Sequence, residues 1–478
     1  MVDIQRRFGR LGLFLPEILL PRTDIKPEKW AVIACDQFTH DRGYWERVKN
    51  TVGGAPSTLN LIYPEAFLAD DDRAARIENI HRTMKQYLAG DVFSKPQAGC
   101  VYVERNTPHN AGRRGVVIAV DLEHYDWQPH ARRLIRCTEG TVAERLPPRM
   151  DIRRGAALET THVLLLIDDE RDRLLPELAK RVKNRPPVYR SKLMPDSGDI
   201  SGWFIDSVDD WEFIAAELEK LADRAASRYR SSGAADGKIA ANADTAPFLF
   251  AVGDGNHSLA AAKEIWEEYK KNRPANEMPD GNSSDGVPIH PCRYALVEIE
   301  NIYDPAILFE PIHRVLFGID NGAALSLLSQ LPGFSSRPAA DRSELAQLVK
   351  EPAEGNRLGL IARNGTLGEI SYTLIETSAK GIATASLQPL LDRWLETRKN
   401  AAGQTPPIDY IHGEDALFSL AETQPAGGGL PSAGIFLPPV QKSGLFETVA
   451  NCGPLPRKSF SMGEADEKRF YLECRKLF

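Results

Sequence analysis

The sequence lacks the features that would place it in a membrane or in an oxidising compartment. Its six cysteines are scattered along the chain without a C-x-x-C or C-x-x-H pair, which argues against a zinc site or a disulfide framework. The longest apolar runs, such as residues 163–167 and 247–252, are far shorter than the roughly eighteen residues that a bilayer helix needs. The N-terminal stretch has no pattern of a secretory signal. We therefore expect a cytoplasmic protein that does not span a membrane.

An excess of positive charge is also missing. The chain has 59 lysines and arginines against 66 aspartates and glutamates, a net charge of -7, so a nucleic-acid partner is not expected. No fixed-period repeat or heptad run is present, which excludes a solenoid and a coiled coil. A composition of 42% hydrophobic and 26% charged residues is typical of a folded chain rather than a disordered one.

The order of apolar patterns predicts an α+β fold with a mixed sheet, because strands and helices do not alternate strictly. The predicted strands are 99–104, 115–122, 162–168, 247–252, 293–300, 357–363, 369–375 and 434–437, and helical periodicity covers 77–88, 209–229 and 387–397. A change of character between residues 316 and 340 predicts a boundary. We expect an N-terminal lobe over 1–330 and a C-terminal α/β lobe over 331–478.

The most informative segment, 247–271, reads as strand, tight turn and helix. Its turn consists of Gly253, Asp254, Gly255, Asn256, His257 and Ser258. The glycines allow a ligand to approach the backbone, and the N-terminus of the following helix favours a phosphate group. A capped turn without a ligand is an equally good interpretation of this short pattern. A dinucleotide site is not favoured, because Ser258 stands where the third glycine of that motif belongs.

Residues 254–258 resemble the D-G-H-H-R box of a prokaryotic family of unknown function. That family is related to the nucleotide-dependent free-serine kinases and belongs to the ParB and sulfiredoxin-like superfamily. Three further elements support the resemblance in the same order: 138–141 is similar to H-E-x-T, 311–314 to P-T-H-R and 456–459 to P-x-K-S. Together these four motifs span most of the chain.

The resemblance implies a mixed-sheet ParB/sulfiredoxin-like core with inserted elements. It also implies that the turn binds the phosphates of ATP or ADP with Mg²⁺, for phosphoryl transfer to a small hydroxyl-bearing metabolite such as serine. Asn256 and Ser258 depart from the box. Ser258 stands where the box has an arginine, which could bind phosphate through two hydrogen bonds. A non-catalytic nucleotide-binding regulator or scaffold therefore stays open. A sulfiredoxin-like reductase needs a thiol in or beside the turn, where the sequence has none. A homodimer is compatible with the sequence, which does not determine the oligomeric state.

Several side chains are candidates for this chemistry. Asp36, which follows an apolar run at the position of the family's early acid, is the first choice of catalytic base, and Glu139 is the second. Either carboxylate is also a candidate Mg²⁺ ligand, although Asp36 fits equally well as a turn cap. Ser258 and Thr141 offer hydroxyl groups to the metal or to a phosphate. The cationic and imidazole candidates for binding phosphate are Arg136, His313, Arg314 and Lys458.

Two simpler interpretations accompany these candidates. The arginines around 138–141, Arg136 among them, are as well explained by a solvated basic face as by an anion site. An isolated histidine such as His162 is expected to be structural, and the charged run 464–469 is expected to face solvent.

Overall fold

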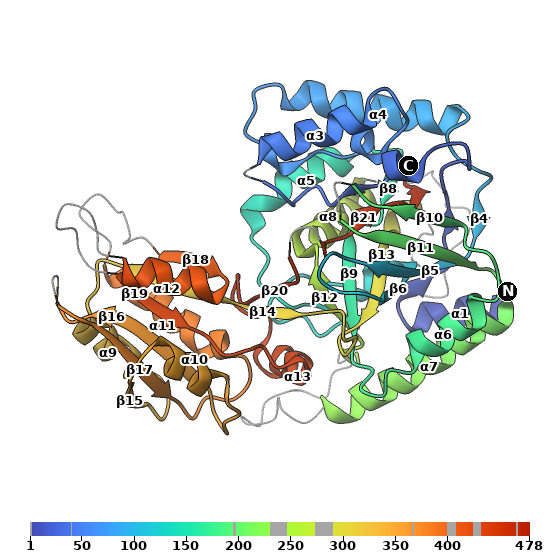
Figure 1. The fold of residues 1–478 in the computed structure, drawn as a ribbon. Coiled ribbons are helices and arrows are strands. Elements are labelled where there is room, and N and C mark those ends of the chain that lie inside the picture. The colour runs from blue at the N-terminus through green and yellow to red at the C-terminus, as the bar shows by residue number, and fades with distance from the viewer. Residues whose placement is uncertain are drawn as a thin grey trace. The chain divides into compact units, whose positions relative to one another are not determined.

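The computed structural model describes residues 2–39, 41–194, 197–229, 246–272, 290–365, 368–398, 408–423, 432–464 and 467–478. The chain forms two compact units (Figure 1). One consists of residues 1–307 together with 463–478, and the other of residues 308–462. Among the described helices, none is long and apolar enough to cross a membrane.

The first unit is built on a mixed nine-stranded sheet. Its strand order is β10-β11-β5-β6-β13-β9-β12-β7, and β1 pairs with β6. The strands of this sheet are β1 (Leu13–Phe14), β5 (Cys100–Asn106), β6 (Arg113–Asp121), β7 (Ile135–Cys137), β9 (Val163–Ile167), β10 (Tyr189–Lys192), β11 (Asp199–Ile205), β12 (Phe250–Asp254) and β13 (Tyr294–Asn301). The pairs β13/β9 and β12/β7 are parallel and the other pairs are antiparallel, which confirms the predicted mixed sheet.

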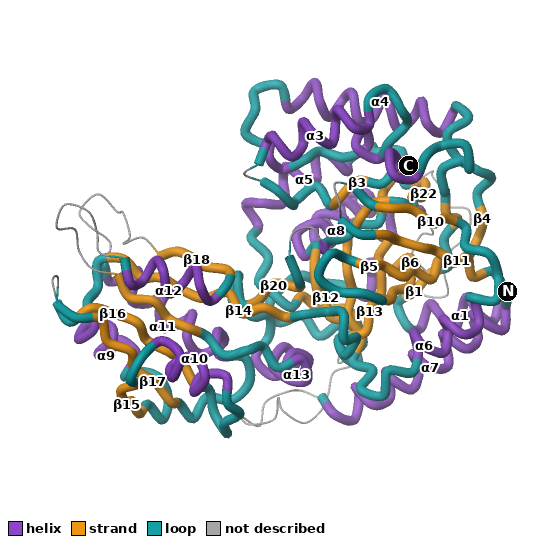
Figure 2. Tube along the Cα trace, viewed as in Figure 1, coloured by secondary structure: helices purple, strands orange, loops and turns teal. Residues whose placement is uncertain are grey.

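Three small ribbons complete the strands of the first unit. They pair β2 (Glu17–Ile18) with β4 (Gln97–Ala98), β3 (Val32–Ile33) with β21 (Phe470–Tyr471), and β8 (Leu158–Thr160) with β22 (Cys474–Lys476). The helices are α1 (Val2–Arg10), α2 (Pro27–Trp30), α3 (Arg42–Val52), α4 (Arg73–Ala89), α5 (Leu146–Arg153), α6 (Leu174–Val182), α7 (Val208–Arg228) and α8 (Asn256–Asn272). Figure 2 shows α1, α6 and α7 gathered on one side of the unit.

The predicted strands of this unit form because their side chains can be buried on both faces. Every residue of β9 and of β13 is buried, as expected for central strands that read as nearly continuous apolar runs. The predicted helix after the turn is also confirmed, since Leu259, Ala262, Ile265 and Trp266 form the buried face of α8.

The second unit has a seven-stranded sheet with the order β15-β17-β16-β19-β14-β18, to which β20 adds by pairing with β14. Its strands are β14 (Phe309–Phe317), β15 (Ser335–Ala339), β16 (Arg357–Arg363), β17 (Ile370–Glu376), β18 (Ile408–His412), β19 (Ser432–Phe436) and β20 (Phe460–Met462). Its helices are α9 (Asn321–Leu328), α10 (Arg342–Lys350), α11 (Ala383–Thr397), α12 (Glu414–Glu422) and α13 (Lys442–Cys452). The described strand pairs are all antiparallel, so this lobe is an α+β unit rather than a parallel α/β one.

The unit boundaries differ from the predicted 1–330 and 331–478 at both ends. Strand β14 pairs with β18, β19 and β20, and these hydrogen bonds place residues 308–330 in the second unit. Strands β21 and β22 pair with β3 and β8, which returns residues 463–478 to the first unit. A local change of composition does not report such long-range pairing.

Buried ion pairs attach this returning segment to the first sheet. Arg469 lies 3.1 Å from Glu298 and also pairs with Glu473, and all three side chains are buried. Next to them, Arg113 binds Glu300 through two hydrogen bonds of 2.7 and 2.6 Å. The 464–469 run was predicted to face solvent; Glu464 is exposed, residues 465 and 466 lie outside the described residues, and Glu467, Lys468 and Arg469 are buried instead.

We expect Glu300→Gln to destabilise the protein by about 3–5 kcal/mol, because it leaves the Arg113 guanidinium buried without its counter-charge. Urea unfolding followed by circular dichroism would measure the loss. Glu177→Gln, which removes an exposed pair with Lys180, is the control and should leave the unfolding midpoint unchanged. An equal loss of unfolding free energy in the two variants would contradict the assigned role of the buried pair.

Candidate functional site

Two of the sequence motifs meet at one edge of the first sheet. Strands β7 and β12 run parallel, so the segments that follow them, 138–141 and 254–258, leave the sheet at the same edge. Two hydrogen bonds connect the segments and their immediate neighbours. The Thr138 hydroxyl donates to the carbonyl of Val252 at 2.6 Å, and the Val142 N–H donates to His257 Nε2 at 3.2 Å. The fold thus places the two motifs close together.

The turn is tighter than its sequence suggests. Strand β12 continues through Gly253 and Asp254, with a register irregularity against β9 between Val252 and Asp254, and α8 begins at Asn256. Gly255 alone makes the turn, with a φ of +82°. A Cβ atom there would lie 3.0 Å from His162 Cδ2. Glycine is therefore required at this position by both backbone conformation and space.

The first turn of α8 opens beside a half-buried carboxylate. The Gly255 N–H donates to Asp254 Oδ1 at 2.9 Å, so this amide is already used within the turn. N–H groups in the first turn of a helix have no acceptor within the helix, and the helix dipole adds positive potential there. Residues 256–258 supply such a turn at the sheet edge.

Lys468, which the sequence analysis did not select, places a cation at this turn. Its Nζ lies 3.4 Å from Asp254 Oδ2, and the side chain is largely buried. Burial alone would raise the pKa of Asp254, but Lys468, His162 and the Gly255 N–H hold that pKa below its usual value. The carboxylate therefore stays ionised between two cations. No local signal identifies Lys468, because it is separated from Asp254 by more than two hundred residues of sequence.

His162 links the turn to the predicted catalytic base. Its Nε2 lies 3.7 Å from Asp36 Oδ2, and its Nδ1 lies 2.6 Å from the hydroxyl of Tyr471. That hydroxyl accepts a hydrogen bond of 2.9 Å from the Cys35 N–H. Burial acts to lower the pKa of His162, yet Asp36, the Cys35 side chain and Asp254 raise it to about 10. His162 is thus a cation in contact with Asp36, in addition to its structural bond with Tyr471.

The other predicted residues of the first unit lie in different surroundings. Asp36 Oδ1 accepts a hydrogen bond from the Gln37 side chain at 3.0 Å. Glu139 and Thr141 follow β7 and are half-buried. Arg136 donates to the carbonyls of Arg133 and Ala246 and lies over the Phe248 ring. Burial and the nearby Arg132 lower the pKa of Arg136 to about 10.

The two C-terminal motifs lie close to each other in the second unit, because β14, which contains 311–314, pairs with β20 directly after 456–459. Arg314 donates to Gln388 at 3.0 Å and lies 4.7 Å from the centre of the Tyr410 ring, and Lys458 Nζ lies 5.9 Å from the same ring. His313 accepts a hydrogen bond from the Leu437 N–H at 3.1 Å. Burial, with the nearby Arg314 charge, lowers the pKa of His313 to about 4. These contacts stabilise the second unit.

A small pocket lies beside the turn and His162. Its volume is about 140 Å³, and Ser258, His162, Cys35 and Tyr471 are among the residues that line it. A thiol therefore lies close to the turn, although no cysteine is near it in sequence. Cys35 reaches it because β3, which precedes Cys35, pairs with β21.

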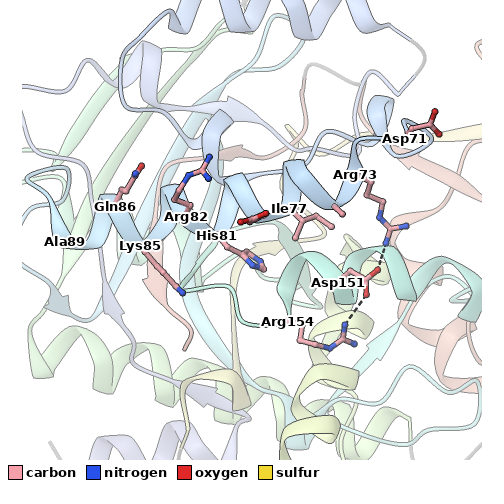
Figure 3. A pocket seen from close by; sticks show the side chains of 12 residues that line it. Asp71, Arg73, Ile77, His81, Arg82, Lys85, Gln86, Ala89, Asp151 and Arg154 are labelled. Carbon is pink, nitrogen blue, oxygen red and sulfur yellow. Dashed lines mark hydrogen bonds and ion pairs between the residues drawn. The ribbon is translucent and has the colours of Figure 1, made fainter.

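A wider groove of about 1220 Å³ runs along α4 and α5 (Figure 3). Asp151 lies between Arg73 and Arg154 and pairs with both, and Arg154 also pairs with Glu268. Among the described residues that line the groove, none belongs to the four motifs. The groove is therefore a charged surface feature separate from the candidate site.

The described residues contain no cluster of three or more histidine, cysteine, aspartate or glutamate side chains arranged to hold a metal ion. Asp36 and Asp254 each face a cation instead, His162 and Lys468 respectively. The described part of the chain thus does not build a metal cage by itself. Mg²⁺ fits this site only if phosphate oxygens and water supply most of its ligands.

Comparison with solved structures found distant likenesses. A conserved hypothetical protein from Pyrococcus furiosus is 12% identical, with 76% of this chain and 97% of that chain covered and a TM-score of 0.30. A free serine kinase in complex with AMP is 12% identical over 74% of this chain and 87% of that chain, with a TM-score of 0.31. A mutant form of free serine kinase in complex with ADP gives the same identity and coverage and a TM-score of 0.32. At these TM-scores no activity is transferred from the likeness.

Comparison with curated proteins gave no match. Residues 19–392 match a family model, a range that covers well over half of the 478 residues. The matched range contains the 138–141, 254–258 and 311–314 motifs. The chain therefore belongs to the family described as "Protein of unknown function (DUF1015)".

Proposed function

We propose that the first unit is a nucleotide-dependent phosphotransferase that transfers a phosphoryl group from ATP or ADP to the hydroxyl of a small metabolite. The observation that carries the proposal is the pair of cations at the turn. Lys468 and His162 both hold the pKa of Asp254 down. The same turn has Ser258 where the box has an arginine. A ParB/sulfiredoxin-like core is part of the same proposal, because it rests on the resemblance of the motifs.

The proposed binding site consists of the first turn of α8 and the two cations. Helix N-terminal amides and a lysine ammonium are a common combination for phosphate oxygens. Gly255 lets the phosphates approach the backbone, and Ser258 offers a hydroxyl. On phosphate binding, Lys468 would exchange part of its interaction with Asp254 for one with the phosphate.

In the proposed reaction, Asp36 orients the acceptor hydroxyl and takes its proton. The hydroxyl oxygen forms a bond with the terminal phosphorus while the bond from that phosphorus to the leaving nucleotide breaks. His162, held by Tyr471, keeps Asp36 in place and offers positive charge near the transferred group. Mg²⁺ bound to the nucleotide would neutralise phosphate charge, with Asp36 or Glu139 as its protein ligand.

A second candidate function is nucleotide binding without turnover, in a regulator or scaffold. The specific observation in its favour is Ser258, which cannot make the two-pronged contact of an arginine with phosphate. Purified protein with ATP or ADP, Mg²⁺ and a set of small alcohols and amino acids separates the two. Phosphoryl transfer supports the first function, and binding without transfer supports the second.

Replacing Lys468 tests the binding site. We expect Lys468→Gln to weaken ADP or ATP binding by about ten- to one-hundredfold, since a charge-assisted hydrogen bond contributes about 1.5–3 kcal/mol. Isothermal titration calorimetry measures this change. Lys476→Gln, an exposed lysine of the same C-terminal segment, is the matched control and should bind normally. Unchanged affinity in a folded Lys468→Gln variant would remove Lys468 from the site.

Replacing Asp36 tests the chemistry. Asp36→Asn should keep nucleotide affinity within about twofold and reduce kcat by about a hundredfold or more, because the amide cannot accept the hydroxyl proton. Initial-rate measurements of phosphoryl transfer, alongside calorimetry, give both values. An active variant with normal kcat would show that Asp36 only caps its turn.

The charge on His162 can be tested independently of activity. A folded-state pKa of about 10 against an ordinary value of 6.5 means that His162 stabilises the fold fully below about pH 6.5 and that this contribution is lost as pH rises through 10. The contribution is on the order of 5 kcal/mol. We expect His162→Gln to flatten the fall in unfolding free energy between pH 7 and 10. If the unfolding free energy of the wild-type protein and of the variant changed identically with pH, a charged His162 would be contradicted.

A further inference from the structure

The pocket beside His162 is too small for a nucleotide. Its volume of about 140 Å³ is close to that of an apolar protein cavity that binds benzene, which corresponds to about six non-hydrogen atoms. A base with its ribose does not fit into this space. If the turn binds phosphate, the pocket is left for the group that receives it.

Most of the pocket wall is apolar. Leu61, Ile62, Met84, Ala261 and Leu477 line it, and all five are buried. They come from segments far apart in the chain, since Met84 belongs to α4 and Ala261 to α8. Such a wall stabilises an alkyl chain by the hydrophobic effect and offers nothing to an ionic group.

Two hydrogen-bonding side chains of the pocket wall belong to the surroundings of the turn. Ser258 is the third residue of α8, and His162, which directly precedes β9, would lie 3.0 Å from a Cβ atom at Gly255. His162 Nε2 is also 3.7 Å from Asp36, the proposed base, which itself does not line the pocket. A ligand hydroxyl can therefore bind at Ser258 and His162 while its chain packs against the apolar wall.

The ionic side chains in the wall are already paired with protein partners. Arg153 lies 2.6 Å from Glu159, and Glu159 also pairs with Arg475. Arg149 pairs with Glu65. A ligand ammonium or carboxylate would have to break one of these pairs, and breaking a buried pair is strongly unfavourable. The pocket therefore discriminates against a zwitterionic amino acid such as serine.

We propose that this pocket is the acceptor subsite and that it selects a small uncharged alcohol with an alkyl chain, about six non-hydrogen atoms in all. The assignment as an acceptor subsite rests on the proposed phosphotransferase function, while the preference for an uncharged alcohol rests on the pocket alone. In the transfer step, the alcohol oxygen forms the new bond to phosphorus. The leaving nucleotide keeps the electron pair of the broken bond, and the hydroxyl proton passes to Asp36.

Binding of isoamyl alcohol and of serine to the full-length protein tests the preference. The two compounds have closely similar sizes and differ in charge, so their comparison isolates the polarity of the pocket. In saturation-transfer NMR titrations we expect isoamyl alcohol to bind at least tenfold more tightly than serine. Equal or tighter binding of serine, or no binding of the alcohol, would overturn the inference.

A variant that fills the pocket locates the binding. Ala261→Leu should weaken binding of isoamyl alcohol at least tenfold and leave ADP affinity unchanged, while Ala75→Leu on the exposed face of α4 serves as the control. If Ala261→Leu does not fold, a longer alcohol tests the size of the pocket with the wild-type protein.

Octan-1-ol, which exceeds the pocket volume, should bind to the wild-type protein more weakly than isoamyl alcohol. Equal or tighter binding of octan-1-ol would overturn the inference.

Transfer assays with ATP and ADP separate this inference from the proposed function. Alcohol binding without transfer to any acceptor would refute the phosphotransferase and the acceptor role and leave an alcohol-binding pocket. Transfer to serine but not to isoamyl alcohol would support the phosphotransferase and overturn the pocket assignment. Transfer to isoamyl alcohol in preference to serine is the expected result.

Discussion

The return of the C-terminal segment to the first unit is the constraint on which the candidate site depends. Residues 467–478 pair with β3 and β8 and are attached to the sheet by buried charges, in particular Arg469 with Glu298 and Glu473. Arg105 and Arg113 also donate to the carbonyls of Lys468 and Glu467. Buried ion pairs of this kind add little net stability but strongly penalise any arrangement that separates them. The segment therefore has one position on the sheet.

That position places two functional groups of the site. Lys468 brings an ammonium to Asp254, and Tyr471 holds both the Cys35 backbone and the His162 ring. His162 in turn contacts Asp36, so the proposed base is positioned by a residue more than four hundred positions away. The first unit thus has a charged surface at the turn and, immediately beside it, a small apolar pocket. Phosphoryl transfer needs this combination, because the phosphate requires cations while the acceptor requires exclusion of water.

The site also explains how a chain can depart from the D-G-H-H-R box and retain positive charge there. Ser258 cannot bind phosphate as an arginine does, yet Lys468 and His162 hold the Asp254 carboxylate between two cations. The positive charge comes from Lys468, in the segment before β21, and from His162, the residue before β9. A lysine is a compact cation without the fork geometry of arginine, so it supplies attraction more than orientation.

The sequence by itself determined the local structure. Local patterns were sufficient to predict β9, β13, α8 and the turn between β12 and α8. Each of these patterns depends on neighbours within a few residues. Asp36 and Asp254 could be proposed as site residues from the chain alone. Only the tertiary structure decided which motifs meet. The parallel pair β7/β12 brings 138–141 next to 254–258. The motifs 311–314 and 456–459 belong to the second unit. Lys468, His162 and Tyr471 join the candidate site only through the fold. Strand pairing and buried ion pairs act between residues that are distant in sequence, and such contacts leave no local pattern.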